Sequence, residues 1–590
     1  MIKLPARPFQ RVLVANRGEI ALRVVRACRD ASLHSIAVFA DGDAEAPFVE
    51  AASESTALGG VTAGETYLDG SKLLDAARQL RAEAVHPGYG FLAEDAAFAQ
   101  AVIDAEMVWI GPPPEVIRLL GDKVAARRLA ESIDVPVVAG TAEPLADAAA
   151  VEAFVAVHGL PVVIKAAHGG GGRGMRVVRR KQDVAALWAM AVGEATAAFG
   201  RPECFVERFV ERARHVEVQL LADTHGAVMV AGDRDCTVQR RHQKLIEEAP
   251  APFLDDALRV ALHDSALAIG RAAGYVGAGT VEFLRDTDGA LSFLEVNCRL
   301  QVEHPVTEEV SGLDLVRAQL TIAAGGAVPS VAPGPSRHAI ELRLTAEDPA
   351  NGFAPSSGTL RTFRMPAGPG VRIDAGVREG TVVGEQFDSL LAKLVVTGAD
   401  RAEALARARR ALAETAVEGV ATSLPFLRAV VEHKAFTGRN GAPFTVHTGW
   451  VEETPPGELG TTDGDVTSES DGTVEVLVGG RWLRVAVPGM ATVAPDVLAE
   501  ARRRSEAAHR QVAAASDAVV VPMQSTVVAL QVAEGEAVGA GDAVAVVEAM
   551  KMQHLLVAPN DGIVAGLTVE VGASVAGGTV LCRVVAGEPP

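Results

Sequence analysis

One short stretch, GTVEFLRDTDGALSFLEVN at residues 279–297, constrains the fold of this chain more than any other. Two apolar, β-prone runs flank Asp288-Gly289, a favoured two-residue turn, so the stretch predicts an antiparallel hairpin. In that register Glu282 lies directly opposite Glu295, and like charges that face each other destabilise a sheet. A divalent cation between the carboxylates removes this penalty, and oxygen ligands suit Mg²⁺. The hairpin therefore predicts a metal site.

The second strand of this hairpin continues as EVNCRLQVE. Alternation with a period of two residues separates polar side chains from apolar ones. The polar face would carry Glu295, Asn297, Arg299, Gln301 and Glu303. One face thus offers metal ligands, a cation and a further carboxylate. The alternative interpretation is a half-exposed strand with a solvated polar face.

A glycine run, GGGGRG at residues 169–174, follows the apolar strand LPVVIKAA and precedes MRVVRR. A dinucleotide-binding fingerprint requires a helix after the glycines, whereas MRVVRR predicts a second strand. A strand–glycine loop–strand unit is typical of a flap whose backbone N–H groups close over phosphates. A mobile hairpin without a ligand is the alternative. Lys165 on the entering strand and Lys123 in LLGDKVAARR are candidate phosphate contacts.

Basic residues gather within DRDCTVQRRHQKLIEE at residues 233–248. The segment is too short and too closely flanked by acids for a nucleic-acid surface. It favours recognition of a small anion such as phosphate or bicarbonate, and solvated charge at a strand edge is the alternative. The basic side chains are Arg234, Arg240, Arg241, His242 and Lys244.

The overall charge and the cysteines exclude several classes of function. Acidic residues outnumber basic ones by 75 to 55, which disfavours binding to nucleic acid or to an anionic membrane. The five cysteines contain no CxxC pair, so we expect neither a zinc site nor a disulfide framework. The sequence has no recognisable signal peptide or membrane-spanning apolar run, and we expect a cytoplasmic protein.

The chain changes character along its length. Its first 120 residues alternate strand and helix signals, which predicts an α/β start. Residues 337–450 predict a strand-rich stretch followed by a helix. Residues 453–473 are polar and acidic and predict a linker, after which a hairpin turns at Gly479-Gly480.

The last segment contains an internal repeat. With a shift of 37 residues, Pro522 falls on Pro559 and Gly535 on Gly572. Two short β units of one pattern predict a small pseudo-symmetric sandwich, with EAMKM at residues 548–552 lying at their junction.

Taken in order, these motifs resemble one family over nearly the whole chain. The chain is similar to the biotin carboxylases of the ATP-grasp superfamily in VLVANRGEIALRVVRAC, HPGYGFLAED, GDK, GGGGRGM, DRDCTVQRRHQK, GTVEFL, EVNCRLQVEHPVTEEVSG and AEDP. Its EAMKMQ is similar to the biotin-attachment turn of a biotin carboxyl carrier domain. Together the motifs resemble the alpha chain of a biotin-dependent acyl-CoA carboxylase.

This resemblance implies a multidomain fold of the α/β and α+β classes. A biotin carboxylase, built from an N-terminal α/β subdomain, an ATP-grasp domain with a glycine lid and a C-terminal subdomain, would come first. A linker with a small β module and an all-β biotinyl, lipoyl-like sandwich would follow. The implied boundaries are 1–120, 121–330 with the lid at about 138–210, 331–450, 451–515 and 516–590.

The resemblance also assigns roles to matching residues. The Mg²⁺ or Mn²⁺ ligands would be Glu282, Glu295 and Asn297, and biotin would be attached to Lys551. The catalytic set would be Lys244, Arg299, Glu303 as general base and Arg343 as the biotin contact, with bicarbonate bound by Lys244, Arg299 and Val302. The ATP contacts would be Lys123, Lys165, Gly171, Gly172, Glu207, Arg208, Phe209, Val210, His215, Gln239 and His242.

The implied activity is ATP-dependent carboxylation of biotin carried on the chain's own C-terminal domain. Glu303 would take the proton of bicarbonate, which attacks the γ-phosphorus under the closed lid. About 140 residues follow position 450, too few for a carrier and a carboxyl-transfer domain. We therefore expect a separate carboxyltransferase subunit in a hetero-oligomer, with residues 474–510 as its candidate dock, and a biotin protein ligase that modifies the chain. The acceptor would be acetyl-CoA or propionyl-CoA.

Two other functions are alternatives at this point. One is an ATP-grasp ligase of another class with an unrelated β tail, which the EAMKM turn disfavours. The other is a carrier or scaffold protein with an inactive ATP site, which the intact carboxylate and basic sets disfavour.

Overall fold

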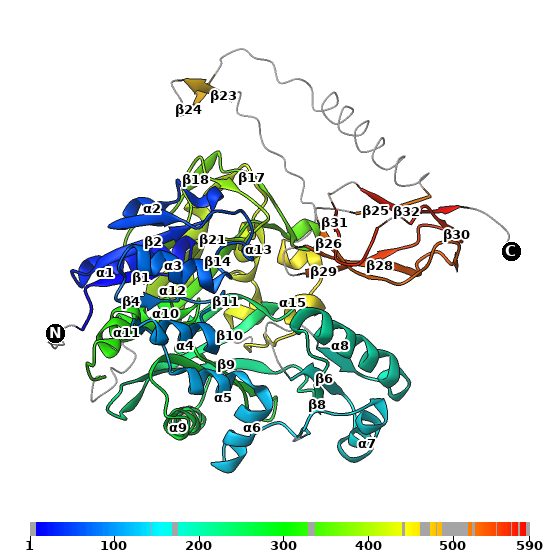
Figure 1. Cartoon of the computed structure of the whole chain (residues 1–590), viewed down its shortest axis with the longest axis horizontal. Helices are drawn as coiled ribbons and strands as arrows, with labels where there is room; N and C mark the ends of the chain where they lie inside the picture. Colours follow the sequence, from blue (N-terminus) through cyan, green and yellow to red (C-terminus); the bar gives the residue numbers. More distant parts are fainter. Residues whose placement is uncertain are drawn as a thin grey trace. The chain divides into compact units, whose positions relative to one another are not determined.

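The structure is a computed structural model in two compact units, Met1–Gly464 and Asp465–Pro590 (Figure 1). It describes residues 8–141, 143–167, 175–328, 337–438, 443–460, 473–478, 481–486, 517–521, 525–549, 552–567, 569–575 and 579–585.

A parallel sheet with helices opens the first unit. Its elements are β1 (Arg11–Val14), α1 (Gly18–Asp30), β2 (His34–Phe39), α2 (Pro47–Ala51), β3 (Glu54–Ala57), α3 (Gly70–Gln79), β4 (Ala84–His86), α4 (Ala96–Asp104) and β5 (Val108–Trp109). The strand order is β3-β2-β1-β4-β5, and neighbouring strands are parallel throughout. The central strands are buried and apolar, as a sheet covered on both faces requires.

A small antiparallel sheet follows after α5 (Pro114–Gly121) and α6 (Lys123–Ser132). Its elements are α7 (Ala148–His158), β6 (Val162–Ala166), β7 (Arg176–Val178), α8 (Val184–Phe199) and β8 (Cys204–Arg208). The strand order is β7-β6-β8, and α7 and α8 pack beside these strands around a hydrophobic cluster of their own (Figure 1). The predicted glycine flap, with Gly171 and Gly172, lies outside the described residues.

An eight-stranded antiparallel sheet forms the centre of the first unit. Its strands are β9 (Arg214–Ala222), β10 (Val228–Arg240), β11 (Gln243–Ala249), β12 (Gly277–Arg285), β13 (Leu291–Asn297), β14 (His338–Thr345), β19 (Val371–Ala375) and β21 (Leu390–Gly398). Their order is β13-β12-β9-β10-β11-β14-β21-β19. The packed helices are α9 (Asp256–Ala272), α10 (His304–Ser311), α11 (Leu315–Ala323) and α12 (Arg401–Glu414).

The basic stretch at 233–248 runs along β10 and β11, which are inner strands of this sheet. Solvated charge at a strand edge is therefore the wrong interpretation for Arg234 and Lys244, whereas Arg241 and His242 are exposed in the turn between these strands. Arg234 illustrates the difference, because its guanidinium is fully buried and donates hydrogen bonds to Glu217, Gln219, Thr280 and Thr307.

Short elements complete the first unit. They are the strand pairs β15 (Glu347–Asp348) with β16 (Ala354–Pro355), β17 (Gly358–Thr359) with β20 (Val382–Val383) and β18 (Thr362–Arg364) with β22 (Ala416–Glu418), and the helices α13 (Leu424–Val430), α14 (Lys434–Thr437) and α15 (Trp450–Glu453).

The second unit holds a hairpin and a β-sandwich. The hairpin strands β23 (Thr473–Val478) and β24 (Arg481–Ala486) pair Val478 with Arg481, as predicted for a turn at Gly479-Gly480. The sandwich strands are β25 (Ala518–Val520), β26 (Ser525–Leu530), β27 (Ala537–Val538), β28 (Ala543–Ala549), β29 (Met552–Val557), β30 (Gly562–Ala565), β31 (Ser574–Val575) and β32 (Val580–Val585).

The sandwich explains the 37-residue repeat. One sheet has the order β25-β32-β30-β27 and the other β29-β28-β26-β31, around a core rich in valine. Strands related by the repeat, such as β26 and β30 or β28 and β32, lie in opposite sheets, so the two copies face each other in a pseudo-symmetric pair. The predicted multidomain fold class is thus confirmed. No helix among the described residues combines the length and apolar character needed to cross a bilayer.

A buried ion pair beside the centre of the large sheet gives a stability prediction. Glu248 on β11 accepts hydrogen bonds from Arg401 at 2.6 and 2.9 Å and pairs with His338 at 2.8 Å. Burial raises the pKa of Glu248, but Arg401 and His338 outweigh burial and lower it from 4.5 to about 2. We expect Glu248→Gln to lower the free energy of unfolding of the first unit by roughly 3 kcal/mol at pH 7, measured by urea denaturation.

The pH dependence of that loss follows from the sign of the shift. A carboxyl group whose pKa is lower in the folded state stabilises the protein above pH 4.5, and this contribution disappears as the pH falls toward 2. The difference between wild type and Glu248→Gln should therefore shrink below pH 4.5. A difference that stays constant down to pH 3 would contradict this account.

Candidate active site

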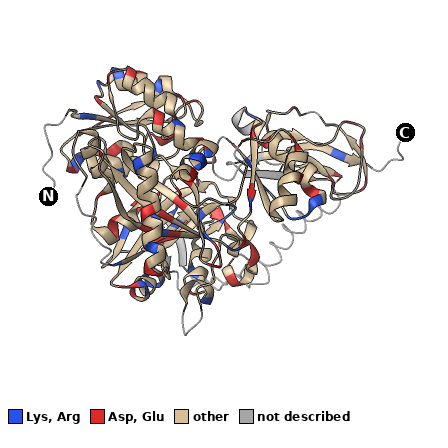
Figure 2. Ribbon diagram, turned by 90° about the horizontal axis from the view of Figure 1, so that it is seen from below, with Lys and Arg blue, Asp and Glu red and all other residues tan. Residues whose placement is uncertain are grey.

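Lys and Arg residues are interspersed with Asp and Glu along the ribbon of each unit (Figure 2). The distinctive charges are inside the molecule. Several carboxylates and cations that the sequence singled out are buried together on one part of the eight-stranded sheet.

The carboxylate hairpin has the predicted pairing but a different turn. Strands β12 and β13 place Glu282 opposite Glu295, which confirms the register. The two-residue turn at Asp288-Gly289 is wrong, because the Asp286 amide donates to the Ala290 carbonyl at 2.9 Å and closes a longer loop. A β-bulge beyond Glu282 compensates for the extra loop residue and restores the register.

Glu282 accepts hydrogen bonds from several predicted site residues. Its Oε1 accepts hydrogen bonds from Lys244 Nζ at 2.8 Å, Asn297 Nδ2 at 2.8 Å and Gln301 Nε2 at 3.0 Å. Its Oε2 lies 3.0 Å from His215 Nε2. Burial raises the pKa of Glu282, but Lys244 and His215 outweigh burial and hold it well below its ordinary value. Glu282 is therefore an ionised carboxylate at neutral pH.

Glu295 is held by a different lysine. Lys123 Nζ pairs with Glu295 Oε2 at 2.5 Å, and Lys123 is the first residue of α6, whose N-terminus is capped by Asp122. The two facing carboxylates are thus each neutralised by a separate cation in this structure. Lys123, predicted as a phosphate contact, thus lies beside the carboxylate hairpin.

The polar strand predicted for residues 295–303 is wrong beyond Asn297. Strand β13 ends there, because the Cys298 amide leaves the ladder and donates to Glu94 Oε1 at 2.8 Å. Arg299 nevertheless returns to the same face, since its guanidinium donates to Asn297 Oδ1 at 2.9 Å and to Gln301 Oε1 at 2.8 Å. The predicted grouping survives although the strand does not.

Lys244 is the centre of the buried cluster. Its ammonium donates to Glu217 at 2.6 Å, Glu282 at 2.8 Å and Glu303 at 2.6 Å. Burial lowers the pKa of Lys244, but these carboxylates reverse the effect and raise it well above its ordinary value. Three strands and the loop before α10 therefore meet at one permanent cation.

Glu303 completes the cluster on the side of β14. It is fully buried and accepts hydrogen bonds from Lys244 Nζ and from Arg343 Nη2, the latter at 2.9 Å. Burial raises its pKa, but Lys244 and Arg343 outweigh burial and hold the pKa well below its ordinary value. The two cations keep Glu303 ionised at neutral pH, the state in which a carboxylate can accept a proton, and they also make it a weaker base than a free glutamate.

A second group of predicted residues lies on the small sheet. Lys165 on β6 donates to Glu207 Oε2 at 2.6 Å, and Arg127 donates to the other oxygen at 3.2 Å. Burial raises the pKa of Glu207, but Lys165 and Arg127 lower it below its ordinary value. Arg208 ends β8, and Phe209 and Val210 follow it, half-buried.

The other predicted residues occupy varied positions. Gln239 is buried on β10 opposite Lys244, and His242 is exposed in the turn between β10 and β11 with a φ of +65°. The Val302 carbonyl accepts a hydrogen bond from Lys393 Nζ at 2.9 Å. Lys551 lies outside the described residues, between the paired Ala549 and Met552 of β28 and β29.

Sequence reasoning missed several members of the cluster. Glu217, Glu94 and Glu247 all contact predicted residues, and Lys393 holds Val302. Only Glu217 had a usable signal, because it follows His215 by two residues on β9 and therefore shares its face. Glu247 lies three residues after Lys244 on β11, whereas Glu94 and Lys393 reach the site from segments far away in the sequence.

The donor set fits a hard divalent cation. Glu282 and Glu295 supply carboxylate oxygens from facing strands, and Asn297 supplies an amide oxygen beside them. Oxygen ligands of this kind bind Mg²⁺ and Mn²⁺. His215, Glu217 and Glu282 also bring ligand atoms close together, within 4.8 Å, but Lys244 already satisfies two of these three residues.

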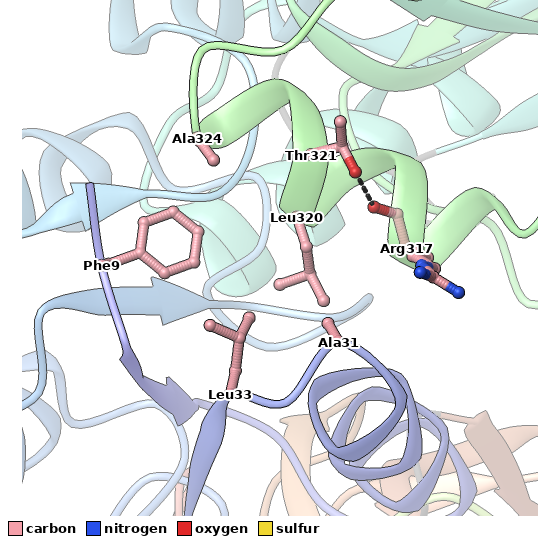
Figure 3. Close-up of a pocket in the computed structure, with 7 residues that line it drawn as sticks. All are labelled: Phe9, Ala31, Leu33, Arg317, Leu320, Thr321 and Ala324. Carbon is pink, nitrogen blue, oxygen red and sulfur yellow. Dashed lines mark hydrogen bonds between the residues drawn. The ribbon is translucent and has the colours of Figure 1, made fainter. Parts of the chain in front are cut away.

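Two hollows in the first unit contain none of the predicted site residues. The smaller is an apolar gap of about 10 Å³ between α11 and the start of the chain (Figure 3); its wall consists of Phe9, Ala31, Leu33, Arg317, Leu320, Thr321 and Ala324. The larger, of about 410 Å³, lies beside Trp109 and Gln319.

Four family profiles match the chain. They are the N-terminal domain of biotin carboxylase over residues 8–117, the ATP-binding domain of the carbamoyl-phosphate synthase L chain over 122–331, the biotin carboxylase C-terminal domain over 341–453 and the biotin-requiring enzymes over 517–584.

Known proteins resemble the chain over most of its length. It is 53% identical to the biotin-dependent acyl-coenzyme A carboxylase alpha3 subunit of Mycobacterium leprae, covering 97% of this chain and 98% of that protein. The biotin carboxylase domain of Hydrogenobacter thermophilus 2-oxoglutarate carboxylase, solved with MgADP, ADP and bicarbonate, is 38% identical with a TM-score of 0.73, covering 76% of this chain and 98% of that one. A single-chain, multi-domain long-chain acyl-CoA carboxylase is 36% identical with a TM-score of 0.66, covering 98% of this chain and 51% of that one.

Proposed function

This chain belongs to the alpha subunits of biotin-dependent acyl-CoA carboxylases, and on this premise we propose that it carboxylates biotin on its own Lys551 for a separate carboxyltransferase subunit. It is a biotin carboxylase that uses ATP and Mg²⁺. The acceptor in our proposal is acetyl-CoA or propionyl-CoA. All five cysteines are unpaired, which supports a reducing compartment, the cytoplasm.

We assign each function to one of the domains predicted from the sequence. Residues 1–120, 121–330 and 331–450 form the carboxylase, with the lid at about 138–210. Residues 451–515 link it to the carrier at 516–590 and include the hairpin β23–β24. A two-stranded hairpin is marginally stable by itself, which supports its role as part of the dock for the carboxyltransferase.

The buried Lys244–Glu303–Arg343 cluster beside the facing Glu282 and Glu295 carries the proposal. In the proposed reaction Lys244, Arg299 and Val302 hold bicarbonate while Glu303 accepts its proton. Mg²⁺ held by Glu282, Glu295 and Asn297 supplies charge neutralisation at the ATP phosphates. Bicarbonate that has taken up the γ-phosphate would break down to CO₂ and phosphate, and the phosphate would take the N1 proton of biotin delivered by the carrier. Arg343 would stabilise the resulting ureido anion, which binds the CO₂.

The nucleotide would be held by residues of two sheets. Lys123 and Lys165 are the proposed phosphate contacts, and both are held by carboxylates that a phosphate would replace. The segment Glu207 to Val210 is the proposed contact of the adenine, with His215, Gln239 and His242 as further contacts and Gly171 and Gly172 in the lid.

The metal assignment predicts a specific defect. We expect Glu295→Gln to raise the Mg²⁺ concentration needed for half-maximal ATP cleavage by about tenfold or more, because one charged ligand is lost. The rate would be measured at fixed ATP over a Mg²⁺ series. Asp288→Asn, which removes one charge from the exposed tip of the same hairpin, is the matched control and should leave the curve unchanged. An unshifted curve for Glu295→Gln would remove Glu295 from the site.

The function itself is tested with the purified, biotinylated chain. ATP cleavage should require bicarbonate and should increase when free biotin is added. Addition of candidate carboxyltransferase subunits with acetyl-CoA, propionyl-CoA and longer acyl-CoAs then identifies the acceptor. Two results would instead support an ATP-grasp ligase of another class: free biotin does not change the rate of ATP cleavage, and streptavidin does not detect the chain.

A further inference from the structure

Two carboxylates hold the guanidinium of Arg343, and only one of them has a role in the proposed reaction. Arg343 donates through Nη2 to Glu303 at 2.9 Å and through Nε to Glu247 Oε1 at 2.7 Å. Among the described residues, Nη1 has no recorded partner. The two carboxylates therefore fix the plane of the guanidinium and leave one edge for a ligand.

The hydrogen bond to Arg343 is the only side-chain hydrogen bond of Glu247 among the described residues. It is fully buried on β11, directly opposite Glu341 of β14, although facing like charges destabilise a sheet. Within the described structure no hydrogen bond reaches Glu247 Oε2 or either oxygen of Glu341. A buried carboxylate that faces another carboxylate lowers the stability of the fold. A functional role in holding Arg343 would explain why Glu247 is present at this position.

We infer that Glu247 is a positioning residue for biotin carboxylation, acting through Arg343 by orienting its guanidinium toward the biotin ureido group. This inference rests on the proposed function. In this inference Glu247 contacts Arg343 and not the substrate, whereas Glu303, which shares the Nη2 group of Arg343 with Glu247, takes the proton of bicarbonate. Loss of Glu247 should therefore impair the use of biotin and spare the cleavage of ATP that bicarbonate alone supports.

The charges around Glu247 support a pH-dependent form of this role. Burial raises the pKa of Glu247 to about 7, although Arg343 lowers it and Glu303 raises it further. The groups facing it are Arg343 and Glu341 from β14, Glu303 from the loop before α10, Lys244 from β11 itself and Cys236 from β10. As the pH falls through about 7, Glu247 takes up a proton and its hold on Arg343 weakens.

The test compares Glu247→Gln with wild type, using free biotin as substrate. Glutamine keeps the shape and one acceptor but loses the charge, so we expect the KM for biotin to rise about tenfold or more. ATP cleavage with bicarbonate and no biotin should change less than about twofold. The wild-type KM should rise between pH 8 and pH 6 at a constant bicarbonate concentration, whereas the KM of Glu247→Gln should stay flat.

Two further variants separate positioning from general stability. Glu248→Gln removes a neighbouring buried carboxylate that holds Arg401, and it should keep the wild-type KM and pH profile despite its lower stability. Glu247→Gln added to Arg343→Lys should raise the KM no further than Arg343→Lys alone, because both act on one contact.

Failure of this inference can be distinguished from failure of the proposed function. An unchanged KM and pH profile for Glu247→Gln would overturn the inference, and so would an additive double variant or an equal loss of ATP cleavage with and without biotin. If wild type itself shows no stimulation by biotin, the proposed function fails before any variant is compared.

Discussion

Replacing Glu303 with glutamine is expected to reduce bicarbonate-dependent ATP cleavage by about 10²- to 10⁴-fold. Glutamine has nearly the same size, but its single oxygen can replace only one of the two carboxylate oxygens, which accept from Lys244 at 2.6 Å and from Arg343 at 2.9 Å. It cannot take up a proton, so bicarbonate would not become a nucleophile. The rate of ADP release, with and without free biotin, measures the effect.

The same change also predicts what remains intact. Lys244 keeps Glu217 and Glu282 as partners, so the fold and the binding of MgATP should survive, as thermal denaturation and nucleotide titration would show. Glu309→Gln is a suitable control, because Glu309 is half-exposed on the helix that follows Glu303 and contacts Thr397 and Arg372. A Glu303→Gln enzyme with more than half of the wild-type rate would exclude Glu303 as the base.

The pairing of Glu282 with Glu295 could be predicted because it depends on local information. Alternating apolar residues and a turn signal define a hairpin within 19 residues, GTVEFLRDTDGALSFLEVN. The predicted turn was wrong, yet the register was right, since a bulge offsets the additional loop residue. The bulge lies on the edge strand β13, where Phe293 also bridges to Val137, and the hairpin sequence alone contains no sign of that distant contact.

The end of β13 shows where local information stops. The alternation of polar and apolar residues continues through residue 303. The Cys298 amide, however, donates a hydrogen bond to Glu94, which lies 204 residues away in the sequence, and the pairing of β13 with β12 ends there. Tertiary contacts of this kind decide strand ends without changing the alternating pattern. The resemblance to biotin carboxylases supplied Arg343 and Lys244, whereas the carboxylates that hold them, Glu217 and Glu247, became apparent only in the structure.

Replacing Lys551 with arginine is expected to abolish biotin incorporation and, with it, carboxylation of any acyl-CoA. Biotin attachment needs a primary amine that can lose a proton and form an amide, and the arginine guanidinium stays protonated. Lys551 is the sole lysine in residues 435–590, so no neighbouring side chain of the carrier can replace it. A streptavidin blot measures incorporation, and acyl-CoA carboxylation is measured in the presence of the carboxyltransferase subunit.

The carboxylase half provides the internal control for this change. Stimulation of ATP cleavage by free biotin should be the same in Lys551→Arg and wild type, because Lys244, Glu303 and Arg343 all belong to the first unit. The carrier should also remain folded, since β28 and β29, on either side of Lys551 in the sequence, are joined by the Ala549–Met552 pair and the core of the sandwich is untouched. Streptavidin signal that persists in Lys551→Arg would place biotin on a lysine of the first unit, and the carrier would then need a different role.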